Sequence, residues 1–351
     1  MIKVGIVGYG FAGSYTYMEM GHFPKDIRVT AVCDINSAAL EKVPEGVERY
    51  SDLDSMLWKA DIDTVVVSCN NNQHFRVVTA AARAGKHIWC EKPAAMSVEE
   101  YDRMLQVVEE NGVSFTVHQQ RRYDRDFSSV REVLKKKLVG DVYTVQSSLY
   151  GYNGNMHDWH VYKAEGGGMM YDWGVHLLDQ ILYLIPGKVK TVYAQMRNVI
   201  NTEVDDFFKI QLLFESGISA EVELGTYFLS DKSNWFTRHW FVGGNRGSMY
   251  ADGFDPVGKI VTTKHLLENV KDKTLGDEGP TRSFGTPEEG LITVSDIPHI
   301  DTTYYDYIQN YIDTRNGKCH FLVRKDEVRR VLLLMEAVRK SSELGRSVDF
   351  E

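Results

Sequence analysis

Short apolar runs alternate with helical stretches over the first third of the chain. Five runs of β-forming residues have the length of buried strands, at 2–7, 28–33, 64–68, 87–90 and 113–117. Helices with clear ends are predicted at about 74–84 and 97–111, because Gly85 and Gly112 follow as stop signals. Strands that alternate with helices form a parallel sheet covered by helices. The first part of the chain is therefore predicted to be a doubly wound parallel sheet.

The pattern changes after about residue 120. After an earlier strand at 141–152, strands follow one another without helices between them at 189–200, 205–214, 218–227, 235–242 and 248–251. Such a succession favours an open, mostly antiparallel sheet. Helices are predicted at 123–138, 166–183, 299–316 and 324–344, and the polar stretch 264–297 is predicted to be a long loop.

The two patterns together predict an α/β protein with two domains, for which 351 residues are sufficient. Residues 1–120 would form the domain with the parallel sheet. Residues 121–351 would form an α+β domain with the open sheet. The C-terminal helices could pack back on the first domain.

Composition and charge exclude several classes of function. The net charge of −9 argues against a nucleic-acid partner. No apolar run is long enough to cross a bilayer, and a strand that begins at Ile2 leaves no room for a signal peptide. The four cysteines show no CxxC spacing and are expected to be free thiols. A cytoplasmic protein is therefore expected.

The first strand leads directly into a glycine-rich turn, Gly8-Tyr9-Gly10-Phe11-Ala12-Gly13, and then into a predicted helix. In this spacing the first glycine permits the turn, the second lets the backbone approach a pyrophosphate, and the third lets the helix pack on the strand. Asp34 follows about 20 residues later, where an acid can bind the ribose hydroxyls and repel a 2′-phosphate. A dinucleotide site for NAD is predicted. NADP is less favoured, although Asn36 and Ser37 could tolerate a phosphate. The alternative is a glycine-rich structural turn.

Polar residues follow two further strands of the predicted parallel sheet. Asn70-Asn71-Asn72-Gln73-His74 follows the third strand, and Glu91-Lys92-Pro93 follows the fourth. Ligands bind beyond the carboxyl ends of parallel strands, so these residues are expected on the same edge as Asp34. In the second part of the chain, Gly166-Gly167-Gly168 opens a helix that carries Asp172, Gly174, His176 and Asp179.

Together the glycine turn, Glu91-Lys92-Pro93 and the Asp172, Gly174, His176 spacing resemble the Gfo/Idh/MocA family, the glucose–fructose oxidoreductase and inositol dehydrogenase group. The resemblance spans nearly the whole chain. It implies a Rossmann domain that binds the cofactor, followed by a substrate-binding α/β domain with an open sheet, through which relatives commonly form dimers or tetramers. The chemistry it implies is NAD(P)-linked hydride transfer at a secondary alcohol of a sugar or cyclitol.

The resemblance also implies roles for individual residues. Lys92 matches the family's catalytic lysine, and Asp172 and His176 match its paired acid and histidine. Gln120 stands where relatives often have asparagine, which is a departure from the pattern. The cofactor is expected at Gly8, Gly10, Phe11, Ala12, Gly13, Asp34, Ser68, Asn70, His74, Glu91, Lys92 and Gln120. The substrate is expected at Lys92, Arg122, Tyr152, His157, Trp159, Asp172 and His176.

These residue types suit the oxidation of a secondary alcohol, which needs a proton acceptor and a nicotinamide that takes the hydride. His176 is the expected base because its ordinary pKa lies nearest the working pH. Lys92 would stabilise the developing alkoxide, or act as the base itself if desolvation lowers its pKa. Asp172, four residues before His176, would orient the imidazole or bind a substrate hydroxyl. The structural alternatives are an exposed i,i+4 pair and a solvated loop lysine.

Residues 150–160 are dense in aromatic and polar side chains. Aromatic faces stack on sugar rings and polar groups bond their hydroxyls, so a substrate-lining loop is predicted, with a packed surface loop as the alternative. No metal is expected, because no common ligand spacing is formed by His157, His160, Asp172, His176 and Asp179. Sheet and interface positions are predicted for Tyr227, Trp235, His239 and Trp240.

Three functions remain open at this point. The first is an NAD-dependent dehydrogenase of a sugar, cyclitol or glycoside, which includes oxidation at C3 of a glucoside. The second is a redox-assisted glycosidase that retains its NAD and shows no net NADH formation. The third is a non-catalytic regulator that binds NAD, against which the complete set of Lys92, Asp172 and His176 argues.

Overall fold

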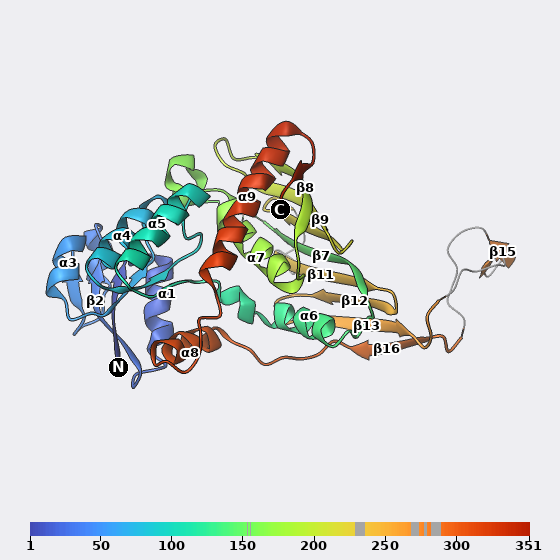
Figure 1. The fold of residues 1–351 in the computed structure, drawn as a ribbon, viewed down its shortest axis with the longest axis horizontal. Helices are drawn as coiled ribbons and strands as arrows, with labels where there is room; N and C mark the ends of the chain where they lie inside the picture. Colours follow the sequence, from blue (N-terminus) through green and yellow to red (C-terminus); the bar gives the residue numbers. More distant parts are fainter. Residues whose placement is uncertain (153, 155, 229–235, 268–273, 277–278, 282–288) are drawn as a thin grey trace.

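The computed structural model describes residues 1–152, 154, 156–228, 236–267, 274–276, 279–281 and 289–351. Asn153, Asn155 and Trp235, and most of the predicted loop between 268 and 288, lie outside the described residues. Two sheets with their helices form the molecule (Figure 1).

The first sheet is parallel throughout and has the strand order β3-β2-β1-β4-β5-β6. Its strands are β1 Ile2–Val7, β2 Ile27–Cys33, β3 Glu48–Tyr50, β4 Thr64–Val67, β5 His87–Cys90 and β6 Phe115–Val117. Its helices are α1 Phe11–Met20, α2 Ser37–Glu41, α3 Leu53–Lys59, α4 His74–Arg83 and α5 Val98–Glu110. The predicted doubly wound parallel sheet is confirmed. Its apolar strands are buried between helices, as all four residues of β4 show.

The second sheet has nine strands in the order β16-β13-β12-β11-β7-β10-β9-β8-β17. They are β7 Val142–Gly151, β8 Val189–Arg197, β9 Phe207–Phe214, β10 Ser219–Gly225, β11 Phe236–Gly244, β12 Gly247–Asp252, β13 Val257–Thr263, β16 Ile292–Asp296 and β17 Val348–Asp349. The β7–β10 pair is parallel and the other pairs within the sheet that are described are antiparallel. The predicted open, mostly antiparallel sheet is confirmed.

Helices cover one face of this sheet and leave the other uncovered (Figure 1). The covering helices are α6 Arg125–Lys135, α7 Val175–Leu184 and α9 Lys325–Leu344. The alternation along β10 agrees with this arrangement, because Ala220, Val222 and Leu224 are buried while Ser219 on the opposite face is exposed.

The prediction of a loop over residues 264–297 is wrong in part. Residues Ile292–Asp296 form β16, which pairs with β13, a strand that was not predicted. All five residues of this edge strand are exposed, so backbone pairing holds it in place and no buried apolar face marks it in the sequence. Two short strands, β14 Thr274–Gly276 and β15 Gly279–Thr281, also pair within this stretch.

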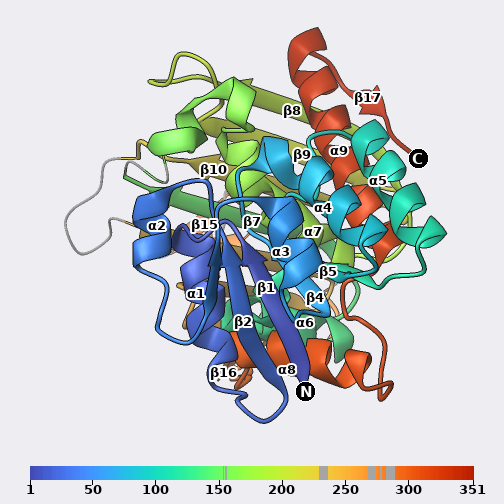
Figure 2. The same ribbon diagram turned by 90° about the vertical axis from the view of Figure 1, so that its left-hand side faces the viewer.

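The last two helices connect the two halves of the molecule. On α8, Tyr304–Arg315, the hydroxyl of Tyr307 donates to Val117 O at 2.7 Å, and the Trp89 ring lies 4.9 Å from the Tyr307 ring. On α9, Glu336 Oε1 accepts a hydrogen bond from Val98 N at the start of α5, at 2.8 Å. Figure 2 shows α8 below the first sheet and α9 beside α5. A domain boundary at residue 120 remains a prediction.

No helix within the described residues is both long enough and apolar enough to cross a membrane.

Candidate active site

The glycine loop (residues 8–13) is tight against the protein at both ends and open in the middle. Gly8 has a φ of +90°, and a Cβ there would lie 2.6 Å from Ser68 O. A Cβ at Gly13 would lie 2.0 Å from Gly8 O, whereas a Cβ at Gly10 would meet nothing within 4 Å. The loop is pinned by Ser68, whose hydroxyl donates to Gly8 O at 2.7 Å. The N-terminus of α1 therefore opens beside free space at Gly10, an arrangement that suits a pyrophosphate.

Asp34 lies at the carboxyl end of β2 and holds the glycine loop. Its Oδ2 accepts a hydrogen bond from Tyr9 N at 2.6 Å, and its Oδ1 accepts one from Asn36 N at 2.8 Å. The next residue, Ile35, is 93% exposed. The carboxylate is thus placed next to the loop, where a ribose would follow the pyrophosphate.

The turn after β4 joins the two halves of the molecule. Asn70 Nδ2 donates to Glu165 Oε2 at 3.0 Å, and Asn71 Nδ2 donates to Gly166 O at 2.8 Å. His74 is fully buried, and its ring nitrogens lie 2.8 Å from Pro93 O and 3.0 Å from Cys69 O. Burial lowers the pKa of His74. These side chains are engaged with the protein itself, and their predicted cofactor contacts remain predictions.

Lys92 and Asp172 meet between the two halves. Lys92 Nζ donates to Asp172 Oδ1 at 2.7 Å and to Asp172 O at 2.9 Å. The side chains are only 17% and 7% exposed, respectively. Lys92 follows β5 and Asp172 precedes α7, so the fold joins residues that are 80 positions apart. Lys92 is therefore not a solvated loop residue, and Asp172 is not part of an exposed pair.

The segment that carries Asp172 is a π-helical turn, η5 Met170–Gly174, which continues into α7. This turn was not predicted, and π-turns occur frequently at functional sites. The glycines before it allow close packing: Gly168 has a φ of +104°, and a Cβ there would lie 2.4 Å from Asp205 Oδ1. Asp205 in turn accepts a hydrogen bond from Met170 N at 2.7 Å, which holds the start of the turn.

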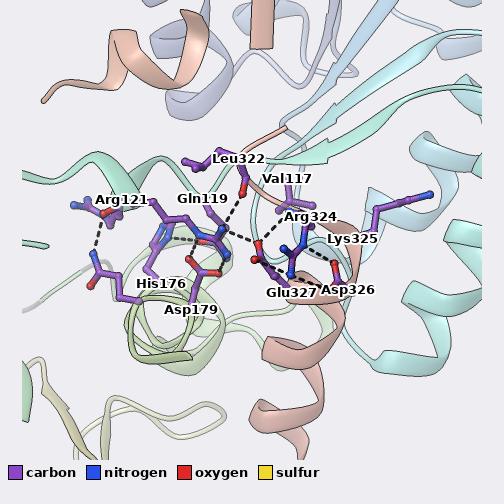
Figure 3. Close-up of polar contacts among 12 residues, drawn as sticks. Val117, Gln119, Arg121, His176, Asp179, Leu322, Arg324, Lys325, Asp326 and Glu327 are labelled. Atoms are coloured by element: carbon purple, nitrogen blue, oxygen red, sulfur yellow. Dashed lines mark hydrogen bonds and ion pairs between the residues drawn. The ribbon is translucent and has the colours of Figure 1, made fainter. Parts of the chain in front are cut away.

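His176 lies on the first turn of α7 and is 3% exposed. Its Nδ1 lies 2.6 Å from Gln119 Oε1 (Figure 3). Burial, reinforced by the positive charges of Lys92 and Arg121, holds the pKa of His176 well below its usual 6.5. The imidazole is therefore neutral and can accept a proton. Gln119 was missed by the sequence analysis, although its place just after β6 resembles that of Asp34 after β2.

Glu91 and Gln120 differ in what they offer to a ligand. Glu91 Oε1 lies 2.5 Å from His118 Nδ1; burial alone would raise the pKa of Glu91, but His118 holds it below the usual value. Gln120 Oε1 is buried and has no hydrogen-bond partner among the described residues. Buried polar atoms are normally satisfied, so Gln120 offers a free acceptor to a bound group.

Arg122 is part of a buried ion cluster. Its guanidinium donates to both carboxylate oxygens of Asp179, at 2.7 and 2.6 Å, and to Glu327 Oε2 at 2.8 Å. The residue is 1% exposed. The geometry gives Arg122 a structural role between η2, Gln120–Tyr123, α7 and α9, and does not support the predicted substrate contact.

One residue of the aromatic segment, His160, lies near enough to the Lys92–Asp172 pair for both charges to act on it. Tyr152 and His157 are exposed. Trp159, on the short helix η3 Asp158–Val161, stacks on the His160 ring with a centroid distance of 3.7 Å. Burial lowers the pKa of His160, and the charges of Asp172 and Lys92 also act on it. His160 was predicted as part of the substrate-lining segment 150–160 and was also considered as a metal ligand.

The side chains of the site suit a dinucleotide better than a metal ion. Within the described ranges no group of three or more His, Cys, Asp or Glu side chains could hold a metal ion. A nicotinamide dinucleotide fits the residues better, because the glycine loop is open at Gly10 and Gln120 Oε1 is an unsatisfied acceptor at the same sheet edge.

Comparison with known proteins supports this assignment. Residues 2–119 match the model of the oxidoreductase family with an NAD-binding Rossmann fold, and residues 127–250 match the GFO/IDH/MocA C-terminal domain. The crystal structure of an NAD-binding protein from Listeria innocua is 31% identical, with a TM-score of 0.85 over 99% of this chain and 96% of that one.

Two curated relatives extend over the full length. The scyllo-inositol 2-dehydrogenase (NADP(+)) IolW of Bacillus subtilis is 24% identical over 100% of this chain and 96% of its own. The myo-inositol 2-dehydrogenase of Thermotoga maritima is 24% identical over 100% of this chain and 99% of its own. The chain therefore belongs to the Gfo/Idh/MocA family of NAD(P)-dependent oxidoreductases.

Proposed function

We propose that this protein is an NAD-dependent dehydrogenase that oxidises a secondary alcohol of a sugar, cyclitol or glycoside. The observation that carries the proposal is the buried Lys92–Asp172 pair beside a neutral His176. The inositol dehydrogenases among the relatives support a polyhydroxylated ring as the substrate.

The proposed roles follow from charge and geometry. The bound nicotinamide would supply the hydride acceptor. Lys92 would stabilise negative charge on the alcohol oxygen as its proton leaves, because a preorganised cation in a buried site acts strongly. His176 would accept that proton, since the unprotonated imidazole has a ring nitrogen free to take it, although its lowered pKa makes it a weaker base than a free histidine. Asp172 would hold the Lys92 ammonium in position through the 2.7 Å contact.

Substrate and cofactor preferences are part of the proposal. Trp159, stacked on His160, would present an aromatic face to a sugar ring. Asp34 favours NAD, because a carboxylate at the ribose repels a 2′-phosphate. Asn36 caps α2 by accepting a hydrogen bond from Ala38 N, so its side chain is already in use. The relative IolW is named as an NADP(+) enzyme, so activity needs to be measured with both NAD and NADP.

The test is NADH formation, followed by absorbance, with a panel of sugars, inositols and glucosides in the presence and absence of added NAD. A signal that requires NAD supports the dehydrogenase and identifies its substrate class. Release of the aglycone from a glycoside without added NAD would instead identify a redox-assisted glycosidase. NAD binding without turnover of any substrate would indicate a regulator.

We also propose a cytoplasmic homo-oligomer that assembles through the uncovered face of the nine-stranded sheet. A hollow of about 330 Å³ lies on this face between β7, β8, β9 and β10, and Leu213 beside it is 40% exposed. Light scattering of the purified protein should give the mass of a dimer or larger species. A monomer at micromolar concentration would contradict this part of the proposal.

A further inference from the structure

Gln119 holds His176, the proposed base, through a buried hydrogen bond. Gln119 is 1% exposed, and its backbone is fixed because Gln119 N donates to Val117 O at 2.8 Å and Arg122 N donates to Gln119 O at 3.2 Å. Its side-chain Oε1 lies 2.6 Å from His176 Nδ1 (Figure 3). Both partners are buried, so water cannot replace this hydrogen bond.

A hydrogen bond to one ring nitrogen decides which tautomer a neutral histidine adopts. An amide oxygen can only accept, so Gln119 Oε1 requires a proton on His176 Nδ1. The other nitrogen, Nε2, then carries the lone pair. We propose that Gln119 is a positioning residue that holds His176 in the Nδ1–H tautomer and presents Nε2 as the proton acceptor. This inference rests on the proposed function of His176 as the base.

The neutrality of Gln119 matters as much as its geometry. A carboxylate at this position would stabilise the imidazolium and so raise the pKa of His176. The groups whose charges lower the pKa of His176 are Lys92 after β5, Arg121 of η2 and His118 after β6, while Asp172 on the preceding turn is paired with Lys92. A neutral amide adds no negative charge that would oppose them, so the ring stays unprotonated in the resting enzyme over the neutral pH range.

The experiment combines a direct readout of the tautomer with kinetics. Nitrogen-15 NMR of the histidine rings should show His176 protonated at Nδ1 in the wild-type protein and as a mixture in Gln119→Leu. That variant should lower kcat by about 10- to 100-fold with little change in KM, as other losses of a residue that orients an active-site histidine do. Gln119→Asn, which keeps an amide on a shorter side chain, should recover part of the loss.

The pH profile separates positioning from simple support of the fold. In the wild type the acid limb of kcat/KM should lie well below pH 6.5, because protonation of His176 is what removes activity. In Gln119→Glu this limb should move to higher pH, since the carboxylate raises the pKa of the ring. The matched control is Gln180→Leu, which removes a buried amide on α7, the helix that carries His176, and should lower stability without moving the limb or the tautomer.

The outcomes distinguish this inference from the proposed function. If the tautomer in Gln119→Leu equals that of the wild type, or the acid limb of Gln119→Glu does not move, the positioning role is wrong. If the NMR result is as expected but His176→Ala retains full turnover, Gln119 still sets the tautomer and the base is a different group. If no alcohol is oxidised at all, the proposed function fails while the NMR measurement still decides the tautomer.

Discussion

The glycine loop (residues 8–13) and the reaction centre, which comprises Lys92, Gln119, Asp172 and His176, are built in opposite ways. The loop consists of six adjacent residues, and what it offers is backbone and empty space at Gly10. The reaction centre consists of side chains from three separate segments, and it combines the Lys92–Asp172 ion pair with the buried, neutral Gln119 and His176. The comparison teaches that changes in the loop should alter binding of the cofactor, whereas changes in the reaction centre should alter turnover and the packing of the two halves.

The largest expected effect is the loss of Lys92. Lys92→Ala, and Lys92→Met with its longer apolar stem, should lower kcat by about 10³-fold, because one preorganised group that acts on the transition state is removed. NAD binding, measured by calorimetry, should persist. Lys86→Ala is the matched control at the opposite end of β5, where Lys86 Nζ bonds only to Ile62 O among its described partners. Near-normal turnover of both Lys92 variants would remove Lys92 from the mechanism.

The next largest effect concerns stability beside the reaction centre, at the buried Arg122–Asp179 ion pair. Asp179→Asn leaves the buried Arg122 guanidinium without its bidentate partner and should lower the free energy of unfolding by about 3 kcal/mol. Urea denaturation followed by circular dichroism measures this change. Asp102→Asn breaks the exposed Arg329–Asp102 pair and should cost less than about 1 kcal/mol. Equal costs for the two variants would show that Arg122 and Asp179 do not support α7.

Two glycine variants should separate folding from binding in the loop. Gly13→Ala places a Cβ against Gly8 O and should destabilise the protein by about 1–3 kcal/mol. Gly10→Ala should keep the wild-type melting temperature, because its Cβ meets open space. It should weaken the affinity for NAD by about tenfold, or 1.4 kcal/mol. Thermal melting with and without NAD measures both. Unchanged NAD affinity in Gly10→Ala would mean that the pyrophosphate does not lie there.

The smallest expected effect is in cofactor choice. Asp34→Ala removes the charge that repels a 2′-phosphate, so the ratio of kcat/KM with NADP to that with NAD should rise by about tenfold, or 1.4 kcal/mol. Some loss of NAD binding should accompany it, because Asp34 also holds Tyr9 N. A ratio equal to that of the wild type would show that Asp34 does not contact the ribose.

Local signals predicted most of the first domain. β1 and β5 have the predicted bounds, and α5 begins directly after Ser97, the predicted start of the helix, whose Oγ accepts a hydrogen bond from Glu100 N at 3.1 Å. These features depend on residues within one turn or one strand of each other. β16 was missed because an exposed edge strand has no buried face to mark it, and β13, which lies next to it in the sheet, has a single buried residue, Ile260.

The candidate site likewise has features that the local sequence predicts and features that it does not. The sequence pointed to Lys92, Asp172 and His176 through their motifs. It did not predict that Lys92 pairs with Asp172 across 80 residues, or that His176 pairs with Gln119 across 57. It also did not predict that Arg122, expected to contact the substrate, forms ion pairs in the interior with Asp179 on α7 and Glu327 on α9.

The sequence by itself therefore determined the elements, the open glycine loop and the residue types that can do redox chemistry on an alcohol. These follow from backbone freedom and side-chain periodicity, which adjacent residues set. Only the tertiary structure decided which groups meet and in what state of protonation. The neutral His176 and the buried Lys92–Asp172 pair exist because two sheets exclude water around them, and both desolvation and charge proximity arise only once distant segments have packed together.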